Sequence, residues 1–196
     1  SGVEMALWDL AGKAYDVPAY QLLGGRFRDE VRLYTDTALS RDKEEYARRM
    51  KSRLDKGFTF LKMDFGIGLI RDIPGALITP KNYDWNAYRM TEHPFTAVQI
   101  TDKGLGELLD YVAVVREAIG YDIPLASDHF GHFGVNTAIR LGKAVEKYRL
   151  AWLEDMIPWH YTEQWKEITR AIETPTLTGE DIYLKEEFIK LIDERA

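Results

Sequence analysis

The sequence contains no cysteine, which excludes disulfide bonds and a cysteine nucleophile. It also has no apolar run that approaches the ~20 residues of a membrane span, and no signal peptide is visible. We therefore expect a cytoplasmic protein that does not act at a membrane.

A surplus of positive charge is also missing. The 26 Lys and Arg residues are outnumbered by 32 Asp and Glu residues, the formal net charge is −6 and the pI is about 5.3. This balance argues against nucleic acid as a partner. The motifs GxGxxG, GxxxxGK[ST], HExxH and GxSxG are absent as well, so dinucleotide, P-loop, zinc-protease and serine-hydrolase chemistry lack support.

A regular pattern of acids lies in the second half of the chain. Three short apolar runs each end on an acid: PLAS before Asp128, LAWL before Glu154 and TLTG before Glu180. The acids are 26 residues apart in both intervals, and the segments 135–147 and 161–173 between them have helical apolar spacing. Units of strand, helix and strand place parallel strands with their carboxyl ends on one side. We therefore expect the three carboxylates to converge.

Converging carboxylates repel one another unless a cation neutralises them. Oxygen ligands favour a hard divalent ion, with Mg²⁺ first and Mn²⁺ second. The alternative is that the three acids cap three unrelated helices. Glu is a poor N-cap, and two of the three positions are Glu, so we interpret Asp128, Glu154 and Glu180 as metal ligands.

These acids, in the contexts ASDHFGH, WLEDMIPW and TGED, resemble the metal ligands of the enolase superfamily, in its mandelate racemase and muconate lactonizing branch. The N-terminal stretch GVEMALWDLAGKAYDVPAYQLLGG is similar to the helix that leads into the barrel in this family. The resemblance implies an α/β fold, a modified TIM-type (β/α)8 barrel. A complete barrel needs about 250 residues, so we expect about the first five βα units, with an N-terminal capping domain and strands six to eight outside this sequence.

The expected organisation of residues 1–196 follows this barrel. We assign a leading helix and linker to 1–30, strands one and two to 31–66, an irregular insertion to 67–103 and the elements from helix two to helix five to 104–196. Strand one is predicted at 31–34, and amphipathic helices are predicted at 3–15, 42–54 and 103–119. The insertion is either a lid or interface segment over the site, or a surface segment that packs on its own barrel.

The predicted strand 58–65 carries a second chemical signal. Its alternate residues Phe60, Lys62 and Asp64 share one face, which would bury Lys62 and Asp64 at the catalytic end of a barrel. Burial lowers the pKa of a lysine and would make Lys62 usable as a base. The alternative is an ordinary ion pair. In the resembled family this strand carries Lys-x-Lys, whose first lysine approaches the substrate carboxylate and whose second removes the α-proton. Lys62 matches the first lysine, whereas Asp64 replaces the second.

His129 and His132 follow Asp128 and are candidate general acids, with hydrogen-bonded structural roles as the alternative. The resemblance implies a lyase that removes the proton α to the carboxylate of a sugar acid and eliminates water through a metal-stabilised enediolate. It assigns the base to a His–Asp dyad on strands seven and six. A racemase, epimerase or cycloisomerase is the alternative within the family, and a non-catalytic metal-binding fragment or subunit is the alternative outside it. We expect a small carboxylate substrate and a homo-oligomer, because a partial barrel exposes a strand edge.

Overall fold

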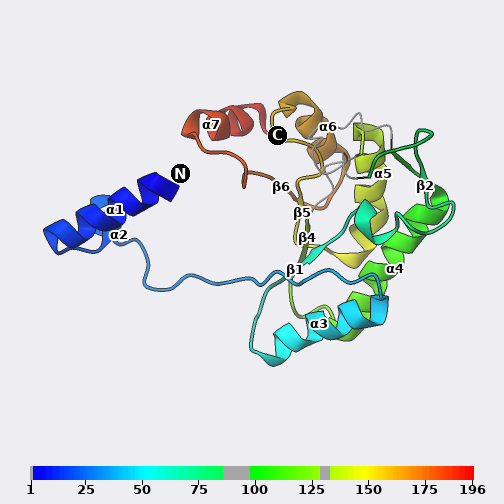
Figure 1. Cartoon of the computed structure of the whole chain (residues 1–196), viewed down its shortest axis with the longest axis horizontal. Coiled ribbons are helices and arrows are strands. Elements are labelled where there is room, and N and C mark those ends of the chain that lie inside the picture. Colours follow the sequence, from blue (N-terminus) through cyan, green and yellow to red (C-terminus); the bar gives the residue numbers. More distant parts are fainter. Residues whose placement is uncertain (1, 86–97, 129–132) are drawn as a thin grey trace. The chain divides into compact units, whose positions relative to one another are not determined.

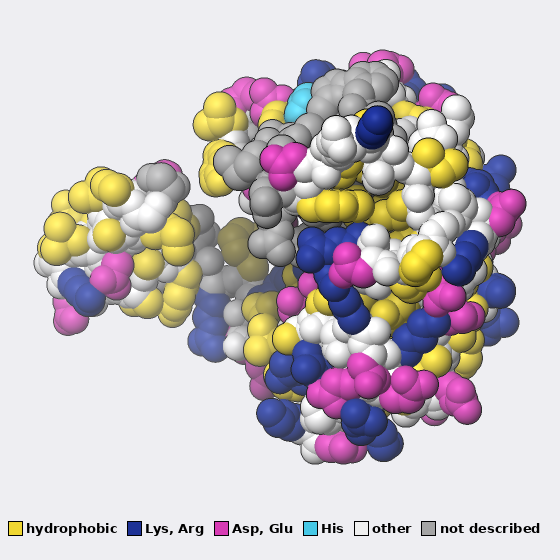
Figure 2. Space-filling view, turned by 45° about the vertical axis from the view of Figure 1, so that its right-hand side comes forward, with side chains coloured by type: hydrophobic (Ala, Val, Ile, Leu, Met, Phe, Trp, Pro, Cys, Tyr) yellow, Lys and Arg dark blue, Asp and Glu magenta, His cyan; other side chains and the backbone are white. Residues whose placement is uncertain are grey.

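The computed structural model describes residues 2–85, 98–128 and 133–196, which form two compact units that divide between Leu33 and Tyr34. The first unit contains the helices α1 (Gly2–Tyr15) and α2 (Ala19–Leu22), and α1 confirms the helix predicted at 3–15. Hydrophobic side chains cover much of the visible face of this unit (Figure 2), and Val3, Met5 and Leu10 are all more than half exposed. Its apolar stripe is therefore not buried within the unit itself.

The second unit is built on a parallel sheet. The sheet has four strands, in the order β1 (Leu61–Asp64), β4 (Leu125–Asp128), β5 (Leu153–Glu154) and β6 (Thr176–Leu177). Every pair of neighbouring strands is parallel. The register places Asp64 beside Asp128 and Glu154 beside Leu177, so the carboxyl ends of all four strands lie along one edge. This is the strand order that the βα spacing predicted.

A helix follows each strand or the insertion, and consecutive helices contact one another around the sheet (Figure 1). The helices of this unit are α3 (Lys43–Asp55), α4 (Asp102–Ile119), α5 (Val135–Val145), α6 (Thr162–Ala171) and α7 (Lys185–Glu194). Side-chain caps fix two of their starts: Asp42 accepts a hydrogen bond from the Glu45 amide at 2.8 Å, and Thr101 accepts one from the Gly104 amide at 3.0 Å. The predicted helices are confirmed to within about two residues.

The hydrophobic core lies between the sheet and these helices. Leu61, Met63, Leu125 and Leu153 of the strands are fully buried, as is Leu108 of α4. The apolar faces of the helices thus cover the strand residues that point toward them. The alternate strand residues, such as Lys62, point to the opposite face of the sheet. None of the helices in the described ranges is both long and apolar enough to span a bilayer.

The strand predicted at 31–34 is wrong. Only Thr35 makes a ladder contact there, as an isolated parallel bridge to Leu61. Its amide donates to the Phe60 carbonyl at 3.2 Å, and its carbonyl accepts from the Lys62 amide at 2.9 Å. Val31 and Leu33 are both about two thirds exposed. Their apolar side chains are therefore not packed in the way that stabilises a strand. Strand propensity without burial did not produce a strand.

The insertion 67–103 is described at both of its ends. It contains a 3₁₀ turn (Ile67–Leu69) and a short antiparallel pair formed by β2 (Leu77–Ile78) and β3 (Gln99–Ile100). Ile67, Leu69 and Ala76 are buried in the core. The described ends therefore pack on the second unit, as one of the two interpretations predicted. A lid formed by the middle of the insertion stays a prediction, since 86–97 lie outside the described residues.

Candidate metal centre

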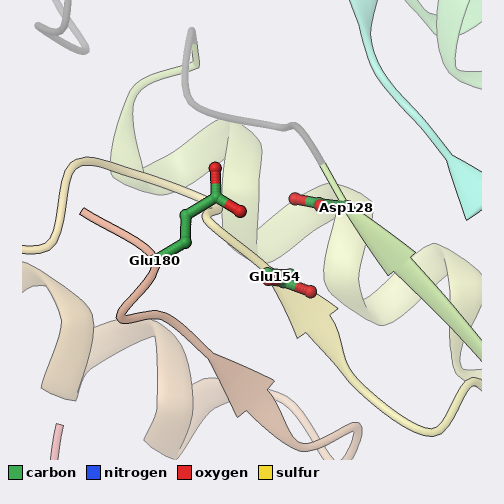
Figure 3. A group of neighbouring side chains, drawn as sticks. All are labelled: Asp128, Glu154 and Glu180. Atoms are coloured by element: carbon green, nitrogen blue, oxygen red, sulfur yellow. The ribbon is translucent and has the colours of Figure 1, made fainter. Parts of the chain in front are cut away.

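Three acids meet at the carboxyl edge of the sheet. Asp128 ends β4, Glu154 ends β5 and Glu180 follows β6 by three residues. One oxygen of each carboxylate lies within 4.8 Å of an oxygen of each of the other two. Figure 3 shows Glu180 reaching from its loop toward the ends of the two strands that carry Asp128 and Glu154. The convergence that the sequence predicted is present.

The donor set suits a hard divalent cation. All three ligand candidates are carboxylates, which Mg²⁺ and Mn²⁺ prefer. Asp128 and Glu154 are only 1 % and 6 % exposed, whereas Glu180 is exposed. Burying two like charges side by side requires compensating positive charge, which the Lys62 ammonium supplies in part and a bound divalent ion would add to. The residues therefore fit the metal ion, and their reading as unrelated helix caps does not account for their meeting: none of them caps α5, α6 or α7.

Lys62 supplies positive charge to the same cluster. Its ammonium forms an ion pair with Asp128 on the neighbouring strand and lies 3.5 Å from Oε2 of Glu154. The residue is 7 % exposed, as predicted. The expected lowering of its pKa is wrong, however. Burial does act to lower the pKa of Lys62, but the hydrogen bond and charge of Asp128, with the charges of Glu154 and Tyr34, together raise it. The ion pairs with Asp128 and Glu154 therefore favour the protonated form of Lys62.

Asp64 ends β1 in register with Asp128 and is half-buried. Its backbone carbonyl accepts a hydrogen bond from the hydroxyl of Tyr46, at 3.1 Å, which ties the strand end to α3. The structure thus places Lys62 and Asp64 on one strand at the predicted edge, with Lys62 paired across to Asp128. A direct chemical role for Asp64 stays a prediction.

The two candidate general acids, His129 and His132, lie outside the described residues. Their roles therefore stay predictions. His160 is described: it is exposed and its ring packs between those of Trp159 and Tyr161, at 5.7 and 4.4 Å between centroids.

Asp155, next to Glu154, has an altered acidity. Burial raises its pKa to about 6; a 2.8 Å hydrogen bond from the Thr178 hydroxyl opposes this rise, and the charges of Asp128, Glu180 and Glu154 add to it. Its φ of 49° lies in the left-handed region, which Asp tolerates better than most residues. Through the hydrogen bond from Thr178, Asp155 joins the end of β5 to the loop after β6.

Trp152 is the contact that sequence reasoning missed. Its indole Nε1 donates a hydrogen bond to Oε2 of Glu154 at 3.0 Å. The available signal was the period of two in a strand, which puts residues 152 and 154 on the same face.

A parallel sheet with alternating helices and three acids at its carboxyl edge defines part of a (β/α)8 barrel with a candidate divalent-metal site. Residues 45–196 match the family model described as enolase C-terminal domain-like, and residues 1–24 match the N-terminal domain of mandelate racemase / muconate lactonizing enzyme. The chain belongs to the mandelate racemase / muconate lactonizing branch of the enolase superfamily.

Curated proteins and solved structures agree with this family. The chain is 33% identical over 180 residues to a D-galactonate dehydratase family member, RspA, of Cellvibrio japonicus, covering 92% of the chain and 44% of that protein. It is 33% identical over 188 residues to the D-xylonate dehydratase of Haloferax volcanii, covering 94% and 41%. A mandelate racemase/muconate lactonizing enzyme-like protein from Rubrobacter xylanophilus superposes with a TM-score of 0.78 at 31% identity, over 97% of the chain and 48% of that structure. The chain thus spans less than half the length of these relatives.

Proposed function

We propose that the protein takes part in the dehydration of a sugar acid, as a lyase that removes the proton α to a carboxylate and eliminates water. The observation that carries this proposal is the meeting of Asp128, Glu154 and Glu180 at the carboxyl edge of a parallel sheet. Two relatives, one named as a D-galactonate dehydratase family member and one as a D-xylonate dehydratase, support the choice of reaction and substrate class.

Asp128, Glu154 and Glu180 would hold Mg²⁺, with Mn²⁺ as the alternative. When bound, the cation supplies positive charge against the substrate carboxylate and against the negative charge that develops as the α-proton leaves.

Lys62 has a complementary role in the proposal. Its raised pKa keeps the ammonium protonated at neutral pH, so it binds and orients the substrate carboxylate and does not remove the proton. The family resemblance assigns proton removal to a His–Asp dyad on strands seven and six of the barrel. His129 and His132 remain the candidates in this chain for protonating the departing hydroxyl.

Because the chain lacks the dyad assigned as base, the reaction is tested with a complete barrel that contains residues 1–196, incubated with Mg²⁺ and either galactonate or xylonate in D₂O. Dehydration followed by tautomerisation gives a 2-keto-3-deoxy acid, whose new C3 position carries solvent deuterium. Formation of that product, lost in Lys62→Met and retained in the surface control Lys51→Met, supports the proposal. Deuterium at C2 without loss of water favours a racemase or epimerase instead. A cycloisomerase would give an isomer without loss of water.

A non-catalytic metal-binding subunit is the second candidate. The edge strand β6 and the exposed apolar residues of α7, including Ile189 and Ile192, favour an oligomer. Light scattering after size exclusion decides: a homo-oligomer that binds Mg²⁺ without turnover supports this candidate, and a monomer that turns over a sugar acid excludes it. Location in the cytoplasm stays a prediction.

A further inference from the structure

Trp152 directly precedes β5 and lies two residues before Glu154, so the period of two of an extended chain puts both side chains on one face. The indole Nε1 of Trp152 donates to Oε2 of Glu154 at 3.0 Å, and the Lys62 ammonium lies 3.5 Å from the same oxygen. Each carboxylate oxygen has two lone pairs. The indole N–H takes one lone pair of Oε2 and the Lys62 ammonium faces the same oxygen, so Oε1 is the more open oxygen for another ligand.

The indole is itself held in place by its neighbours. The ring of Trp152 stacks on Phe60, with centroids 4.9 Å apart and planes inclined by 31°, and Tyr34 meets it edge-on at 5.8 Å. Its backbone carbonyl accepts a hydrogen bond from the Ser127 amide on β4, at 3.1 Å. These contacts leave the indole N–H little freedom to turn away from Glu154.

We propose that Trp152 is a positioning residue for the metal site: by occupying Oε2 of Glu154, its indole N–H restricts this carboxylate to single-oxygen binding of a divalent cation. The inference rests on the proposed metal-binding role of Glu154.

Single-oxygen binding discriminates between cations. Mg²⁺ is small, requires near-octahedral geometry and binds one oxygen from each of a few carboxylates, whereas Ca²⁺ accepts six to eight oxygens and readily takes both oxygens of one carboxylate. A carboxylate whose second oxygen is engaged therefore favours Mg²⁺. Releasing Oε2 would weaken Mg²⁺ binding, because the carboxylate is no longer oriented, and would let Ca²⁺ gain an oxygen.

The variant Trp152→Phe removes the N–H and keeps an aromatic ring against Phe60. Calorimetric titration of the 196-residue chain with MgCl₂, and separately with CaCl₂, gives the two affinities. We expect Trp152→Phe to lose roughly 10-fold or more in Mg²⁺ affinity, the scale seen when a hydrogen-bond partner of a metal ligand is removed. We expect its ratio of Ca²⁺ to Mg²⁺ affinity to rise.

Two controls separate positioning from packing. Trp165→Phe removes an indole N–H that donates to the Pro158 carbonyl at 3.2 Å and not to an acid, so both affinities should match the wild type. Phe60→Leu weakens the ring packing but keeps the indole hydrogen bond, so the ratio of the two affinities should be unchanged. An equal loss for both cations in Trp152→Phe and in Phe60→Leu would overturn the positioning role and leave packing alone.

The proposed function and this inference fail differently. If the wild type binds neither cation, the metal site itself is wrong and the inference falls with it. If the wild type binds Mg²⁺ and Trp152→Phe binds it equally well, only the inference is wrong. If Trp152→Phe does not fold, an NMR titration of the wild type with Mg²⁺ tests the inference. The indole N–H resonance of Trp152 should shift in step with Mg²⁺ saturation, and an unmoved resonance contradicts the inference.

Discussion

Lys62 forms an ion pair with Asp128 across two neighbouring parallel strands, and its ammonium also approaches Glu154. In the metal-free chain this lysine is therefore the cation that offsets two buried carboxylates. A bound divalent ion would take over part of that role, so the importance of Lys62 for stability should depend on metal.

Lys62→Met should destabilise the metal-free chain by about 3 kcal/mol, because removing one partner leaves buried charges uncompensated. In saturating Mg²⁺ the loss should shrink by about 1 kcal/mol or more, since the ion neutralises the same acids. Urea unfolding in EDTA and in Mg²⁺ measures both values. Equal losses in the two buffers would argue that Lys62 and the cation do not share these carboxylates.

Asp155→Asn should change how the stability of the metal-free chain depends on pH. The folded-state pKa of Asp155 is raised to about 6, above its ordinary value of 3.8. Its contribution to stability is therefore present in full below pH 3.8 and is lost as pH rises through about 6. The variant lacks this loss, so its stability relative to wild type should increase by up to about 2 kcal/mol between pH 4 and 7.

Thermal unfolding in EDTA across that range checks the Asp155 prediction. Asn keeps the acceptor for the Thr178 hydroxyl and tolerates the left-handed backbone, so other losses should be small. Parallel stability curves for the variant and the wild type would count against the raised pKa.

Two glycines of α4 offer a matched pair. A Cβ at Gly104 would meet the carbonyl oxygen of Ala76 and lie 2.9 Å from its carbonyl carbon, whereas a Cβ at Gly106 has nothing within 4 Å. Gly104→Ala should cost about 2 kcal/mol through this clash with backbone. Gly106→Ala should gain up to about 1 kcal/mol from helix propensity. Chemical denaturation of both variants tests the close approach of α4 to the segment before β2, and equal effects would contradict it.

Arg116 joins α4 to two loops from a nearly buried position, 3 % exposed. Its guanidinium donates to the carbonyls of Gly120, Ile123, Tyr148 and Arg149, at 2.8–3.2 Å. Arg116→Met leaves these acceptors without their donor and should destabilise the chain by about 3 kcal/mol. The control Arg140→Met, on an exposed ion pair with Asp102, should cost less than about 1 kcal/mol. A similar cost in both variants would show that the four carbonyls find other donors.

The features that the sequence could predict are those set by spacing. Equal intervals between Asp128, Glu154 and Glu180 required equivalent βα units, and equivalent units in a parallel sheet required a common edge. The helices followed from apolar periodicity, and the structure adds the side-chain caps Asp42 and Thr101. These patterns can be recognised within short stretches of sequence. Once the strands are known to be parallel, the patterns determine which residues lie at the carboxyl edge of the sheet.

The features that the sequence could not predict depend on which of several possible neighbours a side chain contacts in the folded chain. Val31 and Leu33 stay about two thirds exposed, and a single bridge forms at Thr35 in place of the predicted strand. Burial lowers the pKa of Lys62 and its carboxylate neighbours raise it. The direction of the net shift therefore depends on the distances to those carboxylates, which the sequence does not give. Trp152 was similarly ambiguous, because an aromatic residue beside an acid can pack, donate a hydrogen bond or, as here, do both.

The central claim is that Asp128, Glu154 and Glu180 together hold one divalent ion. Calorimetric titration of Mg²⁺ into the wild type, Glu154→Gln and the exposed control Glu117→Gln tests it most directly. We predict saturable binding of about one ion per chain in the wild type and in Glu117→Gln, and its loss in Glu154→Gln. Absence of binding by the wild type, or unchanged binding by Glu154→Gln, would contradict the claim.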